Sequence, residues 1–331
     1  MRCAVVGAGA WGSALAERLA QSAHDVRLWA YEDDVAESIN RTHSNPRFLP
    51  HIALPSSIVA STAMHDIVHG ADLVVMVAPS HVTRAVAEMA YPHLSPHAVI
   101  IVASKGIEQY TLVPMTTVVE DVFNMRGVVA LSGPSFALEV ARGQPTALVA
   151  ASRDRHCAEL VQQILRSPTL RVYTQDDVIG VELGGALKNV IAVATGIAEG
   201  LELGFNARAA LITRGLAEMT RLGISLGAHP ATFAGLAGMG DLVLTCTGQL
   251  SRNRALGLDI GRGQTLDEAL AGRDTVAEGV ITTRAAKALA ARHCVTMPIV
   301  DAVYAVLFDG QSPHDAIIEL MNRDLRPERD T

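Results

Sequence analysis

The chain has 331 residues, of which 49% are hydrophobic and 18% are charged. This is enough for about two domains with a large apolar core, and it excludes an intrinsically disordered protein. The net charge of −7 excludes a general nucleic-acid-binding surface, so an anionic substrate would need a local cluster of basic side chains.

The first half of the chain alternates short apolar runs with helical patterns. Runs of Val, Ile, Leu and Ala separated by helices are typical of a parallel sheet with helices on both faces. Such sheets bind ligands at the carboxyl ends of their strands. A helix is expected at 11–21, and the expected strands are 2–8, 26–30, 71–79, 98–104, 127–133 and 146–152.

The segment GAGAWG, residues 7–12, fits the pattern G-x-G-x-x-G between the first strand and the first helix. Gly7 would permit the tight turn, Gly9 the approach of a pyrophosphate, and Gly12 close packing of helix and strand. The helix N-terminus would offer free N–H groups to the phosphates. We therefore predict a dinucleotide-binding domain over residues 1–175, with a Rossmann-type doubly wound parallel sheet. The alternative is a glycine turn without a ligand.

The end of the second strand leaves the choice between NAD and NADP open. An acid there would bind the ribose hydroxyls of NAD, whereas an arginine would favour the 2′-phosphate of NADP. Tyr31 stands at this position. The acids Glu32, Asp33 and Asp34 follow, but they are also typical of the solvated first turn of a helix. Arg41 could reach a phosphate or face water.

Polar residues follow two later strands at the expected ligand edge of the sheet. Lys105 comes directly after the strand at 98–104, and Gly133 and Ser135 come after the strand at 127–133. Because parallel strands present their carboxyl ends at one edge, these residues would face the same crevice. The alternative for each is an exposed loop residue.

After about residue 175 the pattern becomes helical, which predicts an all-α domain over residues 176–331. A long helix near 176–198 would join the two domains, since no Gly/Ser linker separates them. Helix starts are indicated by N-cap patterns. These are Thr174 with Asp177, Thr265 with Glu268, and Ser312 with Pro313 and Asp315.

Lys188 stands inside an apolar run, VELGGALKNVIAVATG, residues 181–196. On a helix its neighbours three and four positions away are Gly184, Gly185, Ile191 and Ala192, so the ammonium would emerge on a face of mostly small residues. A buried lysine must be paired or deprotonated. This predicts an acid–base lysine; the alternative is a structural lysine that extends to the helix end.

Two further polar segments follow the lysine helix. Asp241 lies in the Gly-rich segment GLAGMGDLVLTCT, and Ser251, Arg252 and Asn253 form a short polar run. Arginine makes bidentate hydrogen bonds with phosphate, which Ser and Asn can supplement. Taken with the two lysines, these residues predict an acid–base lysine, a second cation, an orienting carboxylate and an anion site.

With these motifs the chain resembles the bacterial type of NAD(P)-dependent glycerol-3-phosphate dehydrogenase along nearly its whole length. The lysine helix and SRNR are specific to this family, whereas the Gly-rich motif is not. The resemblance is carried by GAGAWGSALA (7–16), NPRFLP (45–50), VAPSH (77–81), SKGIE (104–108), SGPSFALEV (132–140), ELGGALKNVIAVATGIAEGL (182–201), NARAALITRGLAEM (206–219), GLAGMGDLVLTCTGQLSRNR (235–254) and VAEGV (276–280).

The resemblance implies a role for each matching residue. Lys188 would be the proton donor and acceptor, with Lys105 and Asp241 as the other catalytic residues, and Thr245 would help to orient the lysine. The implied substrate contacts are Lys105, Gly133, Ser135, Lys188, Asp241, Ser251, Arg252 and Asn253. The implied cofactor contacts are Gly7, Gly9, Ala10, Trp11, Gly12, Tyr31, Lys105, Ala137, Arg252, Val276 and Glu278.

Two positions depart from the family pattern. Members often carry Arg or His where this chain has Tyr31, which weakens an expectation of NADP preference. Many have Val where this chain has Ala277, a change that looks neutral.

The implied reaction is reversible hydride transfer between NAD or NADP and C2 of the three-carbon phosphate. It converts dihydroxyacetone phosphate to sn-glycerol 3-phosphate for glycerophospholipid synthesis. One alternative is a related two-domain 3-hydroxy acid dehydrogenase, which would not need the Ser-Arg-Asn run. The other is a non-catalytic dinucleotide-binding sensor, which would not need the lysine site.

The remaining expectations concern the surroundings of the protein. The four cysteines are scattered without a C-x-x-C pair, which indicates reduced thiols in a cytoplasmic protein and no metal site. A first strand near residue 3 leaves no room for a leader, and no apolar run approaches the ~20 residues of a membrane helix. No membrane insertion is therefore expected. The apolar helical domain suggests a homodimer.

Overall fold

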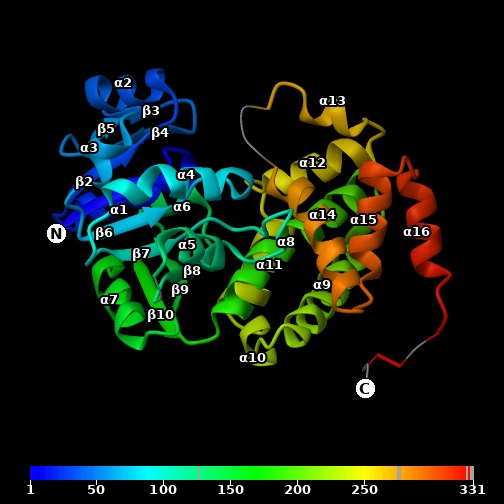
Figure 1. Ribbon diagram of the computed structural model, residues 1–331. Helices are drawn as coiled ribbons and strands as arrows, with labels where there is room; N and C mark the ends of the chain where they lie inside the picture. Colours follow the sequence, from blue (N-terminus) through cyan, green and yellow to red (C-terminus); the bar gives the residue numbers. More distant parts are fainter. Residues whose placement is uncertain (126, 274–276, 326, 329–331) are drawn as a thin grey trace.

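The computed structural model describes residues 1–125, 127–273, 277–325 and 327–328. An α/β region and a helical region lie side by side, and the long helix α8 runs from one into the other (Figure 1). Val276 lies outside the described residues, and so does its expected cofactor contact.

The α/β region is built on one eight-stranded sheet in the order β10-β9-β8-β7-β6-β1-β2-β5. The chain returns to the centre of the sheet between β5 and β6, so β1 and β6 form the switch point where such sheets bind ligands. The strands are β1 (Arg2–Val6), β2 (Asp25–Trp29), β5 (Val59–Ser61), β6 (Leu73–Met76), β7 (Val99–Val102), β8 (Val129–Ser132), β9 (Thr146–Ala151) and β10 (Leu170–Gln175).

The sheet is mostly parallel, which confirms the predicted fold class but corrects one detail. β8 pairs with β9 in the antiparallel direction, and β9 then pairs with β10 in parallel. The expectation of a wholly parallel sheet is therefore wrong at β9. A small antiparallel pair, β3 (Ser44–Asn45) with β4 (Leu49–Ala53), lies outside the main sheet and was not predicted.

Both faces of the sheet are buried, because successive strand residues enter two different apolar clusters. Val5 and Val75 belong to one cluster, while Val6 and Val74 belong to the other. Helices cover these faces, which explains the near-continuous apolar strands. They are α1 (Ala10–Gln21), α2 (Asp33–Thr42), α3 (Met64–Val68), α4 (Thr83–Ala90), α5 (Met115–Phe123), α6 (Ala137–Ala141) and α7 (Arg155–Leu165), with short turns η1 (Ser80–Val82) and η2 (Tyr91–His93).

Among the described residues after Gln175 the structure has helices and no strand, as predicted. Helix α8 (Val178–Gly200) is buried along nearly its whole length and forms the centre of this region. Around and beyond it lie α9 (Gly204–Ser225), α10 (Pro230–Phe233), the π-helical turn η3 (Leu236–Gly240), α11 (Asp241–Thr247), α12 (Arg252–Gly261), α13 (Leu266–Leu270), α14 (Glu278–Arg292), α15 (Pro298–Phe308) and α16 (Pro313–Met321).

Two of the three predicted helix starts are confirmed. Thr265 forms a capping box with Glu268, and Ser312 caps α16. The prediction for Thr174 is wrong, because this residue lies in β10 and the N-cap of α8 is Asp177. Its carboxylate accepts from the backbone N–H of Gly180 at 2.9 Å and so satisfies a free helix donor.

Helix α8 also corrects the expectation that no run is long and apolar enough to cross a membrane. By length and composition it is the one described helix that could do so. Of its most apolar window, 89% is buried inside the protein. The core helix of a globular domain passes the same test, so this is weak support for a membrane span.

Candidate active site

The loop between β1 and α1 has the backbone geometry that the glycine pattern predicts. Gly7 has a φ of +125°, which favours glycine. A Cβ on Gly12 would lie 1.8 Å from the Gly7 carbonyl oxygen, so helix and loop pack too closely for any side chain. A Cβ on Gly9 would meet nothing within 4 Å, which leaves the approach to the loop open.

This loop fits the pyrophosphate of a dinucleotide. The N-cap of helix α1 is Gly9, so the helix begins without a side-chain cap, and its first turn has no acid. The buried indole Nε1 of Trp11 has no hydrogen-bond partner among the described residues. Helix α6, which begins at Ala137, packs against helix α1, which begins with Ala10 and Trp11. Unused donors at a helix N-terminus are what an anionic phosphate needs.

The end of β2 does not decide between NAD and NADP. Tyr31 is 80% exposed. Asp33 and Asp34 form the first turn of α2, which is the alternative that their sequence pattern allowed. Arg41 is exposed and lies 3.8 Å from Glu37, one turn earlier on the same helix. Tyr31 follows β2, which β1 and β6 separate from β7 and Lys105.

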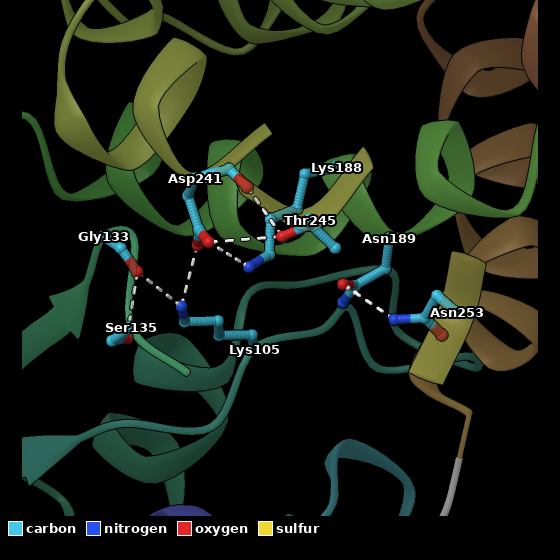
Figure 2. Close-up of polar contacts among 8 residues, drawn as sticks. All are labelled: Lys105, Gly133, Ser135, Lys188, Asn189, Asp241, Thr245 and Asn253. Atoms are coloured by element: carbon cyan, nitrogen blue, oxygen red, sulfur yellow. Dashed lines mark hydrogen bonds and ion pairs between the residues drawn. The ribbon is translucent and has the colours of Figure 1, made fainter. Parts of the chain in front are cut away.

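The centre of the site is a carboxylate between two lysines (Figure 2). Asp241 begins α11 and is 1% exposed. One of its carboxylate oxygens accepts from Lys188 Nζ, and the other accepts from Lys105 Nζ at 2.8 Å. Thr245 Oγ1 donates to the Asp241 carbonyl oxygen at 2.6 Å and lies 3.4 Å from Asp241 Oδ1, the oxygen that accepts from Lys188, so Thr245 reaches the lysine through Asp241.

The surroundings of Lys188 bring its pKa close to neutrality. Burial lowers this pKa to about 7, the positive charge of Lys105 acts in the same direction, and Asp241 opposes both. Burial alone would raise the pKa of Asp241, but the two lysines outweigh this effect and the pKa is lowered. Asp241 is therefore ionised at neutral pH, while Lys188 can both give and take a proton.

The two glycines before Lys188 allow close packing of α8 at the site. A Cβ on Gly184 would lie 2.5 Å from the carbonyl oxygen of Ala237, in the η3 turn that leads into Asp241. A Cβ on Gly185 would lie 2.7 Å from Ser132 Oγ and 3.5 Å from the side-chain carbons of Lys105. Because these two positions have no side chain, α8 can lie close to the η3 turn before Asp241 and to Lys105.

Gly133 and Ser135 lie on the other side of Lys105. The Gly133 carbonyl oxygen accepts from Lys105 Nζ at 3.1 Å and from Ser135 Oγ at 3.0 Å. Gly133 has a φ of +123°, a backbone conformation that favours glycine, in the turn between β8 and α6. The expected substrate contacts Gly133 and Ser135 are thus brought together with the two lysines and Asp241.

The Ser-Arg-Asn run forms the start of α12. Ser251 is its N-cap, and its hydroxyl accepts from the backbone N–H of Arg254 at 3.2 Å. Arg252 is exposed, and the carboxylate of Glu278 lies close enough to interact with its charge. Asn253 is buried and donates from Nδ2 to Asn189 Oδ1 at 2.9 Å.

Two residues at the site were not singled out from the sequence. Asn189 follows Lys188 directly, and its partner Asn253 is 64 positions away. Ser80 donates to both carboxylate oxygens of Glu278, from its backbone N at 3.0 Å and from Oγ at 2.5 Å, across 198 positions. Adjacency to Lys188 could have indicated Asn189, whereas Ser80 stood only within the motif VAPSH (77–81) and without an expected role.

The described residues contain no group of three or more His, Cys, Asp or Glu side chains that could hold a metal ion. Cys3, Cys157, Cys246 and Cys294 are free.

Comparison with known proteins covers nearly the whole chain. Residues 2–158 match the model of the N-terminus of NAD-dependent glycerol-3-phosphate dehydrogenase, and residues 177–318 match its C-terminus. The chain is 53% identical to the glycerol-3-phosphate dehydrogenase [NAD(P)+] of Koribacter versatilis, over 97% of both chains. It is 50% identical to that of Syntrophotalea carbinolica, over 100% of both.

A solved structure is similarly close. The crystal structure of glycerol-3-phosphate dehydrogenase from Coxiella burnetii superimposes with a TM-score of 0.94 at 39% identity, over 97% of this chain and 98% of that one.

Proposed function

The chain belongs to the family of NAD(P)-dependent glycerol-3-phosphate dehydrogenases, and on this premise we propose which of its residues carry out each part of the reaction. The enzyme is an oxidoreductase that acts on the CH–OH group of sn-glycerol 3-phosphate, with NAD or NADP as cofactor and dihydroxyacetone phosphate as the oxidised partner. Its relatives support this function over a 3-hydroxy acid dehydrogenase or a non-catalytic sensor.

The proton-transfer role of Lys188 rests on its contact with Asp241 next to Lys105. The nicotinamide cofactor, when bound, supplies or accepts the hydride. In the reducing direction the Lys188 ammonium donates its proton to the oxygen on C2 as negative charge develops there. In the oxidising direction neutral Lys188 removes the hydroxyl proton. A pKa of about 7 suits both directions, because both protonation states are populated near neutral pH.

Lys105 and Asp241 prepare this step. Lys105 brings a second positive charge to the edge of the site, where it stabilises the developing oxyanion. Asp241 holds both ammonium groups through separate oxygens, which fixes the lysines relative to each other. Gly133 and Ser135 complete the substrate contacts beside Lys105.

The phosphate of the substrate is assigned to the start of α12. Arg252 supplies the charge and Asn253 an amide, while Ser251 holds the first turn of the helix. The bond between Asn253 and Asn189 connects this helix to the residue next to Lys188. The distance from the bound phosphate to the reacting carbon is then set by two packed helices, so the anion site orients the substrate as well as binding it.

The dinucleotide is assigned to the loop of residues 7–12, with Lys105, Ala137, Arg252 and Glu278 on its other sides. The open approach at Gly9 and the unpartnered Trp11 indole support this assignment. We place the domain boundary between Gln175 and Val178, where β10 ends and α8 begins. Cytoplasmic location and supply of glycerophospholipid synthesis remain part of the proposal; the scattered free cysteines support the first.

A homodimer is proposed through the helical region. A cavity of about 1000 Å³ lies between α9, α15, α16 and the following segment, with mainly apolar lining. Leu203, Ile224, Met321 and Leu325 line it and are also exposed, an arrangement that a second copy of the chain would cover. Light scattering should give the mass of a dimer for the wild type and a monomer for Ile224→Glu. A monomeric wild type would refute the proposal.

The reaction is tested by following NADH and NADPH oxidation with dihydroxyacetone phosphate as the substrate. Turnover with either cofactor is expected, and the ratio of the two rates gives the preference that Tyr31 leaves open. A folded protein that binds cofactor without turnover would instead support the sensor. Faster turnover with a 3-hydroxy acid would support the related dehydrogenase.

A further inference from the structure

We propose that Ser80 is a positioning residue for the cofactor, because it holds the carboxylate of Glu278 at the junction of the two regions. The inference rests on the proposed function, in which Glu278 contacts the cofactor, and it extends that function to a residue for which no role was expected. Ser80 begins the η1 turn that follows β6. Glu278 begins α14 in the helical region.

The location of Ser80 brings it to the dinucleotide end of the sheet. β6 is the direct neighbour of β1, and its carboxyl end lies against the loop of residues 7–12. A Cβ on Gly7 would lie 3.1 Å from the backbone of Val77, three residues before Ser80. The contact with Glu278 is therefore made at the switch point of the sheet, where a dinucleotide binds in this fold.

The contact fixes the orientation of the carboxylate. The backbone N–H of Ser80 donates to Oε1 at 3.0 Å, and its hydroxyl donates to Oε2 at 2.5 Å. A carboxylate held through both oxygens cannot rotate freely. Each oxygen has two acceptor positions, so Glu278 keeps the capacity to accept a hydrogen bond from a hydroxyl or amide of a nucleotide.

Gly106 provides the space for this pair. It directly follows Lys105, and a Cβ at this position would lie 2.4 Å from Ser80 Cβ and 3.7 Å from Glu278 Oε2. The backbone next to the catalytic lysine therefore packs directly on the Ser80 side chain. This leaves the serine little freedom to adopt another position.

The backbone that follows Glu278 is held by Asn253, one of the expected substrate contacts. The next residue, Gly279, donates its backbone N–H to Asn253 Oδ1 at 2.9 Å, and Asn253 in turn bonds Asn189. One chain of hydrogen bonds thus leads from Ser80 through the start of α14 to the residue beside Lys188. Loss of the Ser80 hydroxyl would leave the Glu278 carboxylate held by the Ser80 backbone N–H alone, through one oxygen.

A second contact of the same kind supplies a matched control. Thr116, at the start of α5, donates to both carboxylate oxygens of Glu182 in α8, from its backbone N at 2.8 Å and from its hydroxyl. This contact also joins the two regions through a buried glutamate. Neither residue is an expected cofactor contact, so Thr116→Ala loosens the junction without touching Glu278.

The test is NADH binding, measured on the full-length protein by titration of the nicotinamide fluorescence. Ser80→Ala should weaken binding about 10-fold, which corresponds to about 1.4 kcal/mol and is near the lower end for a lost hydrogen bond to a charged group. Thr116→Ala should change the affinity for NADH by less than about 2-fold, a free-energy change well below about 1.4 kcal/mol. Equal affinity of Ser80→Ala and wild type would overturn the proposal. Equal weakening by both variants would do the same, because it would assign the effect to the junction in general.

A double variant tests whether Ser80 acts through Glu278. If it does, adding Ser80→Ala to Glu278→Ala, which removes the carboxylate altogether, should weaken NADH binding no further than Glu278→Ala alone. Additive losses would overturn the proposal. Because binding is read without turnover, a failure here is distinct from a failure of the proposed function, which would appear as a wild type without activity on dihydroxyacetone phosphate.

Discussion

Replacing Asp241 by Asn should move the pH dependence of the reaction, because it removes the one charge that favours protonated Lys188. Asp241 is almost fully buried and touches both lysines. Opposite charges at about 4 Å attract by about 4 kcal/mol at an effective dielectric constant of about 20. This energy corresponds to about 3 pKa units. Loss of the carboxylate should therefore move the pKa of Lys188 well below its value of about 7.

The expected result is a loss of reduction rate at neutral pH that is recovered in acid. At pH near 7 the protonated fraction of Lys188, and with it dihydroxyacetone phosphate reduction, should fall by a factor on the order of 10² to 10³. Initial rates at saturating NADH, from about pH 5 to 9, should level off in acid for the wild type, whereas the rates of the variant should still be rising at pH 5. Asp309→Asn makes the same charge change at an exposed position and serves as the control. An Asp241→Asn midpoint equal to that of the wild type would refute the reasoning.

Three other changes give distinct outcomes. Arg252→Ala should raise the KM for dihydroxyacetone phosphate strongly and also lower kcat, and steady-state kinetics with an unchanged KM would place the phosphate elsewhere. Gly184→Ala should lower the free energy of unfolding by about 1–3 kcal/mol and lower kcat, because its Cβ would press on the Ala237 carbonyl before Asp241. Denaturant unfolding and kcat values equal to those of the wild type would contradict this. The buried carboxylate of Glu218 accepts from the backbone N–H of Ile299, and burial raises its pKa from 4.5 to about 7. Between these two pH values the folded wild type holds one proton more than the unfolded chain, so its stability falls as the pH rises through them. Glu218→Gln should remove up to about 3 kcal/mol of that fall in unfolding measured across the window, and parallel curves would argue against it.

The sequence predicted correctly those elements that are determined by contacts between residues close together in the chain. Gly7 has a positive φ and Gly12 packs against the Gly7 carbonyl, both within the β1–α1 turn, and the capping box at Thr265 is complete within four residues. The fold class could be predicted because strands buried on both faces are apolar along nearly their whole length, and such runs are visible in the sequence.

The strands that were missed have weak or misleading patterns. β3 and β5 are two and three residues long, too short for a periodicity to be seen. β10 alternates buried and exposed residues and ends in polar ones, so Thr174 resembled a helix start. Asp177 offers the same capping chemistry three residues later and is the N-cap of α8, and its carboxylate also accepts from the backbone N–H of His229.

The site was predictable in its residue types but not in its connections. The sequence indicated Lys188, Lys105 and Asp241 as separate candidates. One carboxylate holds both lysines because α11 and the loop after β7 meet at α8. This meeting is a property of the fold and not of any local sequence pattern. Ser80 was missed for the same reason, since its partner lies 198 positions away in another region.

The central claim is that Lys188 transfers the proton, and the Lys188→Ala variant tests it most directly. Turnover of dihydroxyacetone phosphate and NADH binding should be measured on the same folded sample. The account predicts NADH binding close to that of the wild type and turnover lower by a factor on the order of 10² or more. Turnover close to that of the wild type would remove Lys188 from the mechanism.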